Sequence, residues 1–453
     1  MSTDARFADT PQTAVSASGD TASAAPPVKA VVYVAENALS YVQGGGVVAS
    51  HVLKGLPADK VVGFYGYKGI TVSPEYGDRF HLLPPHWRAP AWWDQVERRL
   101  LALGLTRTAA RLKRALVLRN PEPFIQEDLR AALAVLDSRG FRPEIVYTAP
   151  LSLRFLALAV GIARHYDVPM AVLHMDDWLE EDSKTIAAPA QREAWRQRII
   201  ALMREAGARA LAATTNSPHL AEKLERVTGY PFFAANNACP DLMAGKAERL
   251  FQPLPPAQPG GRVPVLTYAG ALNLHLQGET LLWLARAVSE LNFEGMPCRL
   301  DVFTPIEFAP LINAEQIPDV VVYRGHAGPD RLLDAYLASD FLVASTTFRP
   351  DNLVLFRYSL ATKLSEYLCV GKPVLSIGHP DWAVHDYVRR NGCGFAVTER
   401  ERVGMKAELR RILATPAQQL DAVGRANRSL WEKQHDIRIM AQPTREAIGL
   451  PPL

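Results

Sequence analysis

Residues 359–378 read Ser-Leu-Ala-Thr-Lys-Leu-Ser-Glu-Tyr-Leu-Cys-Val-Gly-Lys-Pro-Val-Leu-Ser-Ile-Gly, the order of a loop, a short helix, a tight stop and a buried strand. Ser359 and Thr362 are of the residue types that cap helix N-termini. Gly371 suits the left-handed position that ends a helix, and the β-branched run after it predicts a strand. Three apolar residues at helical spacing predict the buried face of the helix: Leu364, Tyr367 and Leu368.

The predicted helix carries two charged residues near its start. Backbone N–H groups and the positive dipole end of a first turn suit a diphosphate, and Lys363 adds a charge at that place. We therefore expect the amides of residues 359–362, which include Ser359 and Thr362, to bind the donor phosphates together with Lys363. Glu366 lies one turn further on the same face, where a carboxylate can accept hydrogen bonds from a ribose diol. A simple Lys363–Glu366 surface ion pair on an ordinary helix would explain the same residues.

This stretch resembles the nucleotide-sugar site of GT-B glycosyltransferases, especially glycosyltransferase family 4, which carries a Lys-Leu-x-Glu-Tyr-Leu-x-x-Gly-x-Pro-Val segment. The resemblance covers about residues 28–425 and is strongest in 263–400. It implies an α/β protein with two Rossmann-like, doubly wound domains that face a cleft. It also implies that Glu366 holds the donor ribose, and that the enzyme retains anomeric configuration without a metal. No cofactor is then expected beyond the nucleotide sugar, which is a substrate.

Bulk composition agrees with a globular protein of more than one domain. The chain has 453 residues, of which 48% are hydrophobic and 21% are charged. A net charge of +3 provides no basic field for nucleic acid. The four cysteines are scattered, which argues against a zinc site or a disulfide framework and fits a reducing compartment. No secretion signal is recognisable at the start, and no segment reaches the ~20 apolar residues of a membrane span.

Short apolar runs alternate with helical patterns, which is the signature of parallel α/β sheets. The Pro- and Gly-rich segment 252–264 predicts a linker between two such sets. We expect the following organisation: a disordered tail (1–27), an acceptor domain (28–255), a donor domain (263–425) and a C-terminal helix that crosses back (426–453). The expected strands are 28–35, 60–65, 144–148, 170–174, 210–215, 232–235, 263–269, 299–303, 320–323, 341–344, 373–377 and 395–397.

Three consecutive glycines follow the first expected strand. Gly44, Gly45 and Gly46 let the backbone approach a ligand closely, although the pattern is neither GxGxxG nor a Walker loop. In family 4 a Gly-Gly loop at this place lies near the sugar and phosphates of the donor. A tight strand-to-helix turn is an equally good interpretation on local grounds.

A polar cluster follows the strand expected at 170–174. His174 ends that strand, and after Met175 come Asp176 and Asp177. The carboxyl end of a strand faces the cleft in this architecture, and the resemblance places a His there against the transferred sugar. Asp176 or Asp177 would orient the acceptor, or act as base if the mechanism inverted. The alternative is a capping His and an N-cap Asp at the start of the next helix.

The second half departs from the family pattern where phosphates are bound. Segment 268–278 resembles a Gly-Arg-Leu…Lys-Gly segment, in which Gly270 and Gly278 match but Ala271 replaces Arg and Gln277 replaces Lys. The first glutamate of the family's pair is Tyr358 here. Compensating charge is then expected from the helix N-terminus or from other basic side chains: Lys363, Arg357, Arg349 or His275.

Arg324-Gly325-His326 follows another expected strand and weakly resembles the segment that contacts the nucleobase. This makes His326 a candidate donor contact. A plain strand-to-helix turn explains the same three residues equally well.

Residues 92–119 combine seven Lys or Arg with two acids, leucines at helical spacing and a pair of tryptophans at the start. Basic charge, aliphatic bulk and Trp together are typical of an interfacial amphipathic helix. Such a helix would suit an enzyme whose acceptor is a lipid-linked sugar. A helix pair that caps the domain with a solvated basic face is the competing interpretation.

The sequence therefore predicts a glycosyltransferase that moves a sugar from a nucleotide-sugar donor to a glycan or lipid-linked glycan in surface-polysaccharide assembly. The expected location is the cytoplasm, with peripheral contact to the inner face of the membrane. Two alternatives remain: a catalytically inactive GT-B partner subunit of an assembly complex, and a sugar-nucleotide epimerase. The first is motivated by the missing Arg, Lys and Glu.

Overall fold

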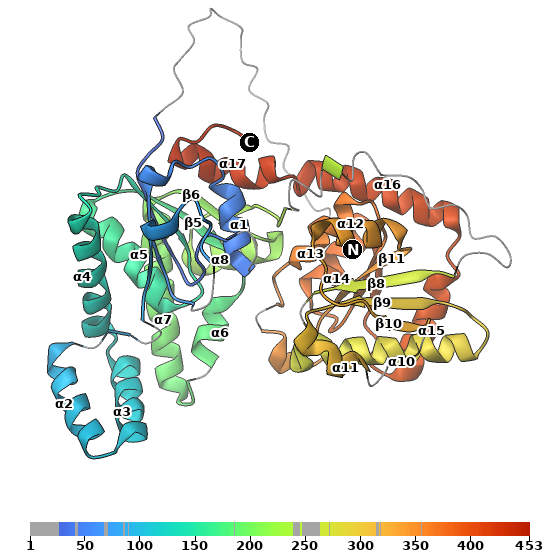
Figure 1. Ribbon diagram of the computed structural model, residues 1–453, viewed down its shortest axis with the longest axis horizontal. Coiled ribbons are helices and arrows are strands. Elements are labelled where there is room, and N and C mark those ends of the chain that lie inside the picture. The colour runs from blue at the N-terminus through green and yellow to red at the C-terminus, as the bar shows by residue number, and fades with distance from the viewer. Residues whose placement is uncertain are drawn as a thin grey trace, which may run out of the picture.

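The structure is a computed structural model, and it places two parallel sheets side by side (Figure 1). It describes residues 27–40, 44–67, 71–84, 87–88, 90–184, 186–238, 245–246, 263–270, 272–313, 317, 319–354 and 356–453. The expected tail 1–27 falls outside these residues except for its last position, and so does linker 252–264 except for its last two.

The N-terminal sheet has the strand order β3-β2-β1-β4-β5-β6-β7, and all its pairs are parallel. The order reverses between β1 and β4, which is where doubly wound sheets bind ligands. Its strands are β1 (Val31–Ala35), β2 (Val61–Tyr65), β3 (Phe80–Leu82), β4 (Ile145–Ala149), β5 (Met170–His174), β6 (Ala210–Thr215) and β7 (Phe233–Ala234).

The C-terminal sheet repeats this topology in the order β10-β9-β8-β11-β12-β13, again fully parallel. Its order reverses between β8 and β11. Its strands are β8 (Val265–Ala269), β9 (Arg299–Phe303), β10 (Val321–Tyr323), β11 (Phe341–Ser345), β12 (Val374–Ile377) and β13 (Gly394–Val397).

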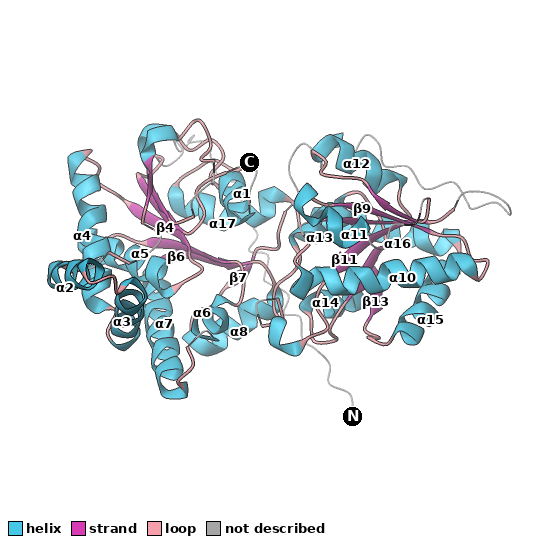
Figure 2. Ribbon diagram, turned by 60° about the horizontal axis from the view of Figure 1, so that its bottom comes forward, coloured by secondary structure: helices cyan, strands magenta, loops and turns pink. Residues whose placement is uncertain are grey.

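Helices cover both faces of each sheet (Figure 2). Those of the first half are α1 (Gly44–Val52), α2 (Ala91–Ala102), α3 (Thr106–Arg119), α4 (Glu122–Ser138), α5 (Leu153–Tyr166), α6 (Trp178–Lys184), α7 (Pro189–Arg209) and α8 (Pro218–Thr228). Those of the second half are α10 (Glu279–Phe293), α11 (Ala309–Asn313), α12 (Pro329–Ala338), α13 (Thr362–Cys369), α14 (Ala383–Asn391), α15 (Arg402–Leu413), α16 (Ala417–Gln434) and α17 (Ile437–Ile448).

Strand alternation decides which helices each sheet face receives. In β1, Val32 and Val34 point into a core formed with α4, α5 and α7, whereas Val31 and Tyr33 point into the core under α1 and α17. The C-terminal sheet is sandwiched in the same way, between α12, α13 and α14 on one face and α10 and α15 on the other. Both faces being buried explains why the strands read as continuous apolar runs.

The α/β pattern predicted from the sequence is confirmed, and all twelve expected strands are found with ends shifted by up to three residues. The extra strand, β3, is a three-residue edge strand too short to carry a periodic signal. Gly371 has a φ of 64°, as predicted for the position after a helix. The expected capping was wrong: Ala361 is the N-cap of α13, Thr362 is its first residue, and Ser359 uses its hydroxyl elsewhere.

Segment 92–119, expected to be either one amphipathic helix or a helix pair, is a hairpin of two helices. Gly104, with a φ of 72°, takes a left-handed conformation that ends α2, and α3 begins two residues later. The hairpin projects away from the N-terminal sheet at the lower left of Figure 1.

The last two helices lie on different halves of the molecule. Trp431 of α16 is buried in the C-terminal core, whereas Met440 and Ile448 of α17 are buried in the N-terminal core. Arg445, which is 3% exposed, fastens α17 by donating to the carbonyls of Val52 and Lys54 at 2.9 and 2.8 Å. The chain end thus ties the two halves together.

Arg445→Ala should lower the free energy of unfolding by about 3 kcal/mol, because it leaves buried carbonyl oxygens without a donor. Urea unfolding followed by tryptophan fluorescence measures this. Arg438→Ala on the same helix is the matched control, because that side chain is 67% exposed and pairs with Asp436 two residues before it. It should cost less than about 1 kcal/mol. Equal losses in both variants would contradict the role of Arg445.

Candidate active site

The carboxyl end of β5 and the loop before α13 meet across the two halves. Asp176 is the second residue after β5, and its carboxylate accepts a hydrogen bond from the Ser359 hydroxyl. The same hydroxyl lies 3.4 Å from the carbonyl of Met175, and Ser359 is buried. Burial raises the pKa of Asp176 to about 6, against the lowering effect of the Ser359 bond. Two predicted site residues, far apart in sequence, are therefore in direct contact.

Asp177 has a different environment. The Lys223 ammonium of α8 donates to it at 2.5 Å and lies 3.6 Å from Glu180. The same ammonium stands 4.9 Å above the ring of Tyr358, the residue at the position of the family's first glutamate. Asp177 thus neutralises the charge of Lys223, whose side chain is 13% exposed, and this pairing favours a structural role for Asp177.

His174 is closed off from solvent in this arrangement. Its side chain is 1% exposed, its ring stacks on Trp178, and Trp178 Nε1 donates to its Nδ1 at 3.1 Å. Burial lowers its pKa to about 4, so the ring is neutral at pH 7. A neutral ring packed between Trp178 and Phe232 anchors the end of β5.

Helix α13 carries the predicted donor pair in its first turns. Lys363 Nζ donates to both Glu366 oxygens at 2.9 and 3.0 Å, and the Tyr336 hydroxyl donates to Oε2 at 3.1 Å. Glu366 is only 6% exposed, so this is not an ordinary surface ion pair. Lys363 is 35% exposed, so its side chain is also partly in contact with solvent. Thr362 is exposed, and no side chain caps the first turn of the helix.

The other expected cations are spread out. Arg357 is ion-paired with Asp381, and Arg349 grips Glu279 through two bonds of 2.9 and 3.2 Å. His326 is exposed in the turn after β10, where Gly325 has a φ of 77°. Gly270 follows β8 directly and donates to the carbonyl of Phe303 at 3.0 Å. The side chain of His275 lies outside the described part of the structure, and so does Ala271.

The glycine run opens α1. A Cβ on Gly46 would stand 2.2 Å from the carbonyl oxygen of Ala38, so this glycine is needed for the chain to pack on itself. This favours the tight-turn interpretation at Gly46. Gly44 and Gly45 form the first turn beside it, directly after the undescribed residues 41–43.

One notable residue was missed by the sequence reasoning. Glu36 follows β1 at the point where the strand order reverses, is 5% exposed, and accepts bonds from Leu151 N at 2.7 Å and Ser152 Oγ at 2.5 Å. Burial raises its pKa to about 7. Its carboxylate occupies the N-terminus of α5. An acid directly after the first expected strand was a readable signal, whereas Lys223 and Tyr336 gave none.

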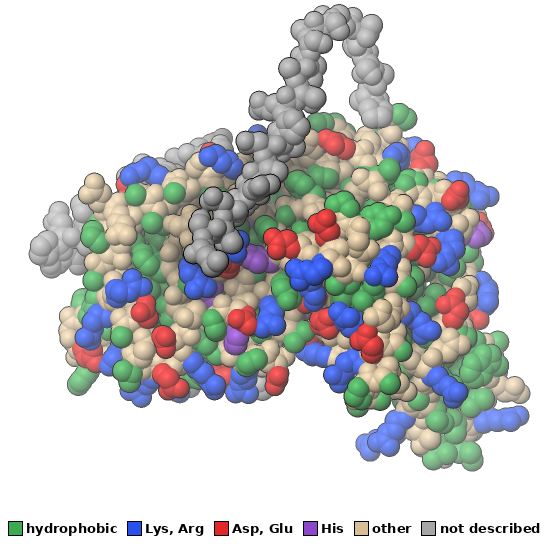
Figure 3. Space-filling model, turned by 180° about the vertical axis from the view of Figure 1, so that it is seen from behind, with side chains coloured by type: hydrophobic (Ala, Val, Ile, Leu, Met, Phe, Trp, Pro, Cys, Tyr) green, Lys and Arg blue, Asp and Glu red, His purple; other side chains and the backbone are tan. Residues whose placement is uncertain are grey.

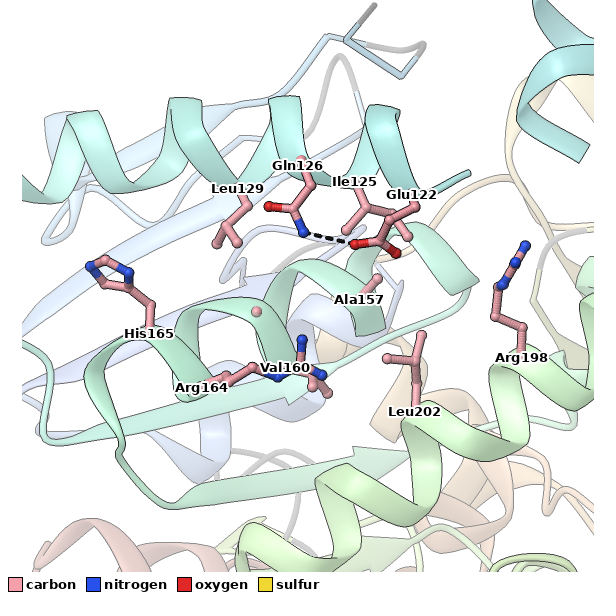
Figure 4. A pocket seen from close by; sticks show the side chains of 11 residues that line it. Glu122, Ile125, Gln126, Leu129, Ala157, Val160, Arg164, His165, Arg198 and Leu202 are labelled. Atoms are coloured by element: carbon pink, nitrogen blue, oxygen red, sulfur yellow. Dashed lines mark hydrogen bonds between the residues drawn. The ribbon is translucent and has the colours of Figure 1, made fainter. Parts of the chain in front are cut away.

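A groove of about 290 Å³ lies outside the cleft, between α4, α5 and α7 (Figure 4). Some polar side chains at its rim are already paired with other side chains of the protein: Gln126 donates to Glu122 at 2.8 Å, and Arg164 donates to Glu205 at 3.0 and 2.7 Å. We therefore assign it no ligand. Within the described ranges, no helix is long and apolar enough to cross a bilayer, and no three acidic, His or Cys side chains are grouped to hold a metal ion.

Asp176→Asn removes a partly buried carboxyl whose pKa rises from 3.8 to about 6 in the fold. A raised folded-state pKa stabilises the protein below about pH 4, and this contribution is lost as the pH rises through 6. At pH 8 the variant should therefore be more stable than the parent by up to about 3 kcal/mol, and the two should converge at pH 4. Urea unfolding at both pH values measures this.

Asp177→Asn is a second test of the same kind, because burial also raises the pKa of Asp177, against the lowering effect of the Lys223 ion pair. It should likewise cost no stability at pH 8 relative to pH 4. A difference between Asp176→Asn and the parent that did not vary with pH would contradict the assignment.

No family model matches the sequence, and no curated protein matches it. Solved structures match over nearly the whole chain. A glycosyltransferase from Rickettsia africae matches at 12% identity and a TM-score of 0.55, covering 93% of this chain and 98% of its own. An α,α-trehalose 6-phosphate synthase from Burkholderia multivorans matches at 12% identity and a TM-score of 0.58, covering 93% of this chain and 96% of its own. A trehalose-6-phosphate structure from E. coli, bound with UDP-2-fluoro glucose, matches at 11% identity and a TM-score of 0.53, covering 93% of this chain and 100% of its own. The chain therefore has the two-domain GT-B fold of glycosyltransferases.

Proposed function

We propose that this protein is a glycosyltransferase that takes a sugar from a nucleotide-sugar donor. The observation that carries the proposal is the meeting of the Asp176 carboxylate with the loop that leads into the Lys363–Glu366 pair. A partly buried acid at the carboxyl end of β5 thus lies beside the loop that leads into α13, and ligands of doubly wound sheets bind at the carboxyl ends of the strands. The likeness to a protein described as a glycosyltransferase, and to a structure bound with UDP-2-fluoro glucose, supports it.

On the donor side, the existing ion pair would be exchanged for ligand contacts. A diphosphate would take the Lys363 ammonium together with the uncapped amides of the first turn of α13. Glu366, released from Lys363 but still held by Tyr336, would accept hydrogen bonds from the ribose diol. The ion pair keeps the buried carboxylate satisfied until the nucleotide arrives.

On the acceptor side, Asp176 is the better of the two aspartates, since Asp177 is committed to Lys223. In a retaining reaction the acceptor hydroxyl attacks the anomeric carbon from the leaving-group side. The carbon–diphosphate bond then breaks, and the hydroxyl proton goes to the departing phosphate. The protein mainly positions the reactants and stabilises the leaving charge. In an inverting reaction Asp176, with a pKa of about 6, would take the proton instead.

A thermal-shift panel of UDP, GDP, ADP, CMP and dTDP tests the donor site. One nucleotide should raise the melting temperature, because a ligand at a hundred times its Kd adds about 2.7 kcal/mol to the folded state. Glu366→Ala should abolish the shift. Glu408→Ala, which removes a solvent-exposed carboxylate from α15, should keep it. A shift that survives in Glu366→Ala would place the nucleotide elsewhere.

The substitutions at Ala271, Gln277 and Tyr358 support one competing function, a catalytically inactive partner subunit of a polysaccharide assembly complex. Turnover separates the two. The purified parent protein should release nucleoside diphosphate from one sugar nucleotide when a glycan acceptor is present, and Glu366→Ala should lose at least about 100-fold of that rate. A parent protein with no turnover on any donor would favour the partner-subunit function. Conversion of the donor to its C2 epimer without acceptor would instead indicate an epimerase.

The expected biological setting is assembly of a surface polysaccharide, with a glycan or lipid-linked glycan as acceptor and the cytoplasm as location. This setting comes from the family resemblance around residues 359–378. The features of helices α2 and α3 bear on the membrane part of it.

A further inference from the structure

Helices α2 and α3 form a projecting hairpin that makes few contacts with the rest of the protein (Figure 1). Within α2 only Trp93 is buried, and within α3 only Ala109 and Val117 are. Glu97 serves the hairpin itself, accepting from Trp93 Nε1 at 3.0 Å and lying 3.9 Å from Lys113. Most of its surface is thus available to something other than this chain.

The tip of the hairpin is apolar. Leu101, Leu103 and Leu105 are 46%, 72% and 43% exposed, and they surround the left-handed Gly104 that forms the turn. A stripe of exposed apolar residues, spaced at i, i+4 and i+11, continues from the tip along one face of α2: Trp92, Val96 and Leu103. Exposed apolar residues gathered on one projecting element are uncommon on a soluble surface and mark an interaction site.

The hairpin is also the basic part of the molecule. Residues 91–119 carry seven Lys or Arg against two acids, a net charge of +5, whereas the whole chain is +3. The rest of the chain is therefore net negative, with 43 basic and 45 acidic residues. Arg107, Arg111 and Arg114 follow the i, i+4, i+7 spacing of one helix face. Figure 3 shows hydrophobic side chains gathered on this projection, flanked by Lys and Arg.

We propose that the α2–α3 hairpin docks this protein on a bilayer of anionic lipids, with Leu101, Leu103 and Leu105 inserted among the lipid chains. The basic side chains supply attraction to the headgroups, and the tip leucines supply apolar burial, so both requirements of interfacial binding are met. A second copy of this chain is a poorer occupant, because it would bring two surfaces of +5 together.

The hairpin dimensions fit shallow insertion. Helix α3 has 14 residues, so the tip stands about 21 Å from the base of the hairpin. Insertion of the tip by about 5–10 Å leaves the body above the headgroups. The docking itself does not depend on the proposed function. Its purpose does rest on that function, because the hairpin would hold the transferase near a membrane-bound acceptor.

Vesicle co-flotation of the full chain tests the proposal, with neutral phosphatidylcholine vesicles compared with vesicles containing 30% phosphatidylglycerol. The protein should float with the anionic vesicles and not with the neutral ones, and the binding should weaken with added salt. Arg107→Gln together with Arg111→Gln should weaken binding by about thirtyfold. The triple change of Leu101, Leu103 and Leu105 to Ser should weaken it by at least about tenfold.

Matched controls separate the hairpin from general stickiness. Phe293→Ser with Val403→Ser removes apolar side chains that are 94% and 76% exposed elsewhere, and Arg411→Gln with Arg425→Gln removes two exposed charges. These variants should bind as the parent does. No flotation at low salt, equal loss in the controls, or equal binding to neutral vesicles would overturn the proposal. Sedimentation of the same variants gives a further test. If the parent protein is a dimer, and the hairpin variants lose both the dimer and the vesicle binding, the proposal is overturned because the hairpin then serves self-association.

The nucleotide thermal shift provides the independent readout. Hairpin variants should keep the parent's response to nucleotide, so loss of flotation with an intact shift concerns docking alone. A chain that floats but binds no nucleotide would leave the docking standing and overturn the proposed transferase.

Discussion

The docking of loop 357–360 on the N-terminal half is the interaction on which the candidate site depends. The Ser217 hydroxyl donates to the carbonyl of Tyr358, and Asn237 Nδ2 donates to the carbonyl of Leu360 at 3.2 Å. Ser359, between them, bonds to Asp176. Buried backbone carbonyls must be paired somewhere, and here the partners come from the other half of the molecule. This pairing fixes where α13 begins and presents its first turn at the junction of the two sheets.

A second connection runs through the chain end. His435 lies between α16 and α17, and its Nδ1 is 2.9 Å from the carbonyl of Asn237, while its Nε2 is 2.7 Å from the Tyr387 hydroxyl. Burial lowers the pKa of His435 to about 4, so it is neutral and can donate to one neighbour while accepting from the other. Asn237 is thus held from both sides, by its side chain and by its carbonyl. Because Asn237 bonds both to loop 357–360 and to His435 near the chain end, the spacing between the two halves does not depend on one hydrogen bond alone.

Local features of this protein were predictable where one segment contains all the information. The buried stripe of α13, the stop at Gly371 and the parallel strands follow from period and from glycine chemistry, which act within about ten residues. The capping role of Ser359 was mispredicted because its hydroxyl bonds to residues almost 200 positions away. Lys223 beneath Tyr358 and Tyr336 beside Glu366 could not be foreseen for the same reason. Glu366 could be found from a local motif, but its contacts could not.

The same long-range contacts give a physical reason for the departure at position 358. Lys223 already lies near two carboxylates, Asp177 and Glu180, and Arg196 provides the further charge that Glu180 needs, at 3.0 Å. A glutamate in place of Tyr358 would add a third acid beside the lysine, in a region where Asp177 is 2% exposed and its pKa is already raised by burial. An aromatic ring over the ammonium adds attraction without adding charge. Tyr358 therefore keeps the junction neutral and leaves Lys363, the second residue of α13, as the cation best placed to meet a phosphate.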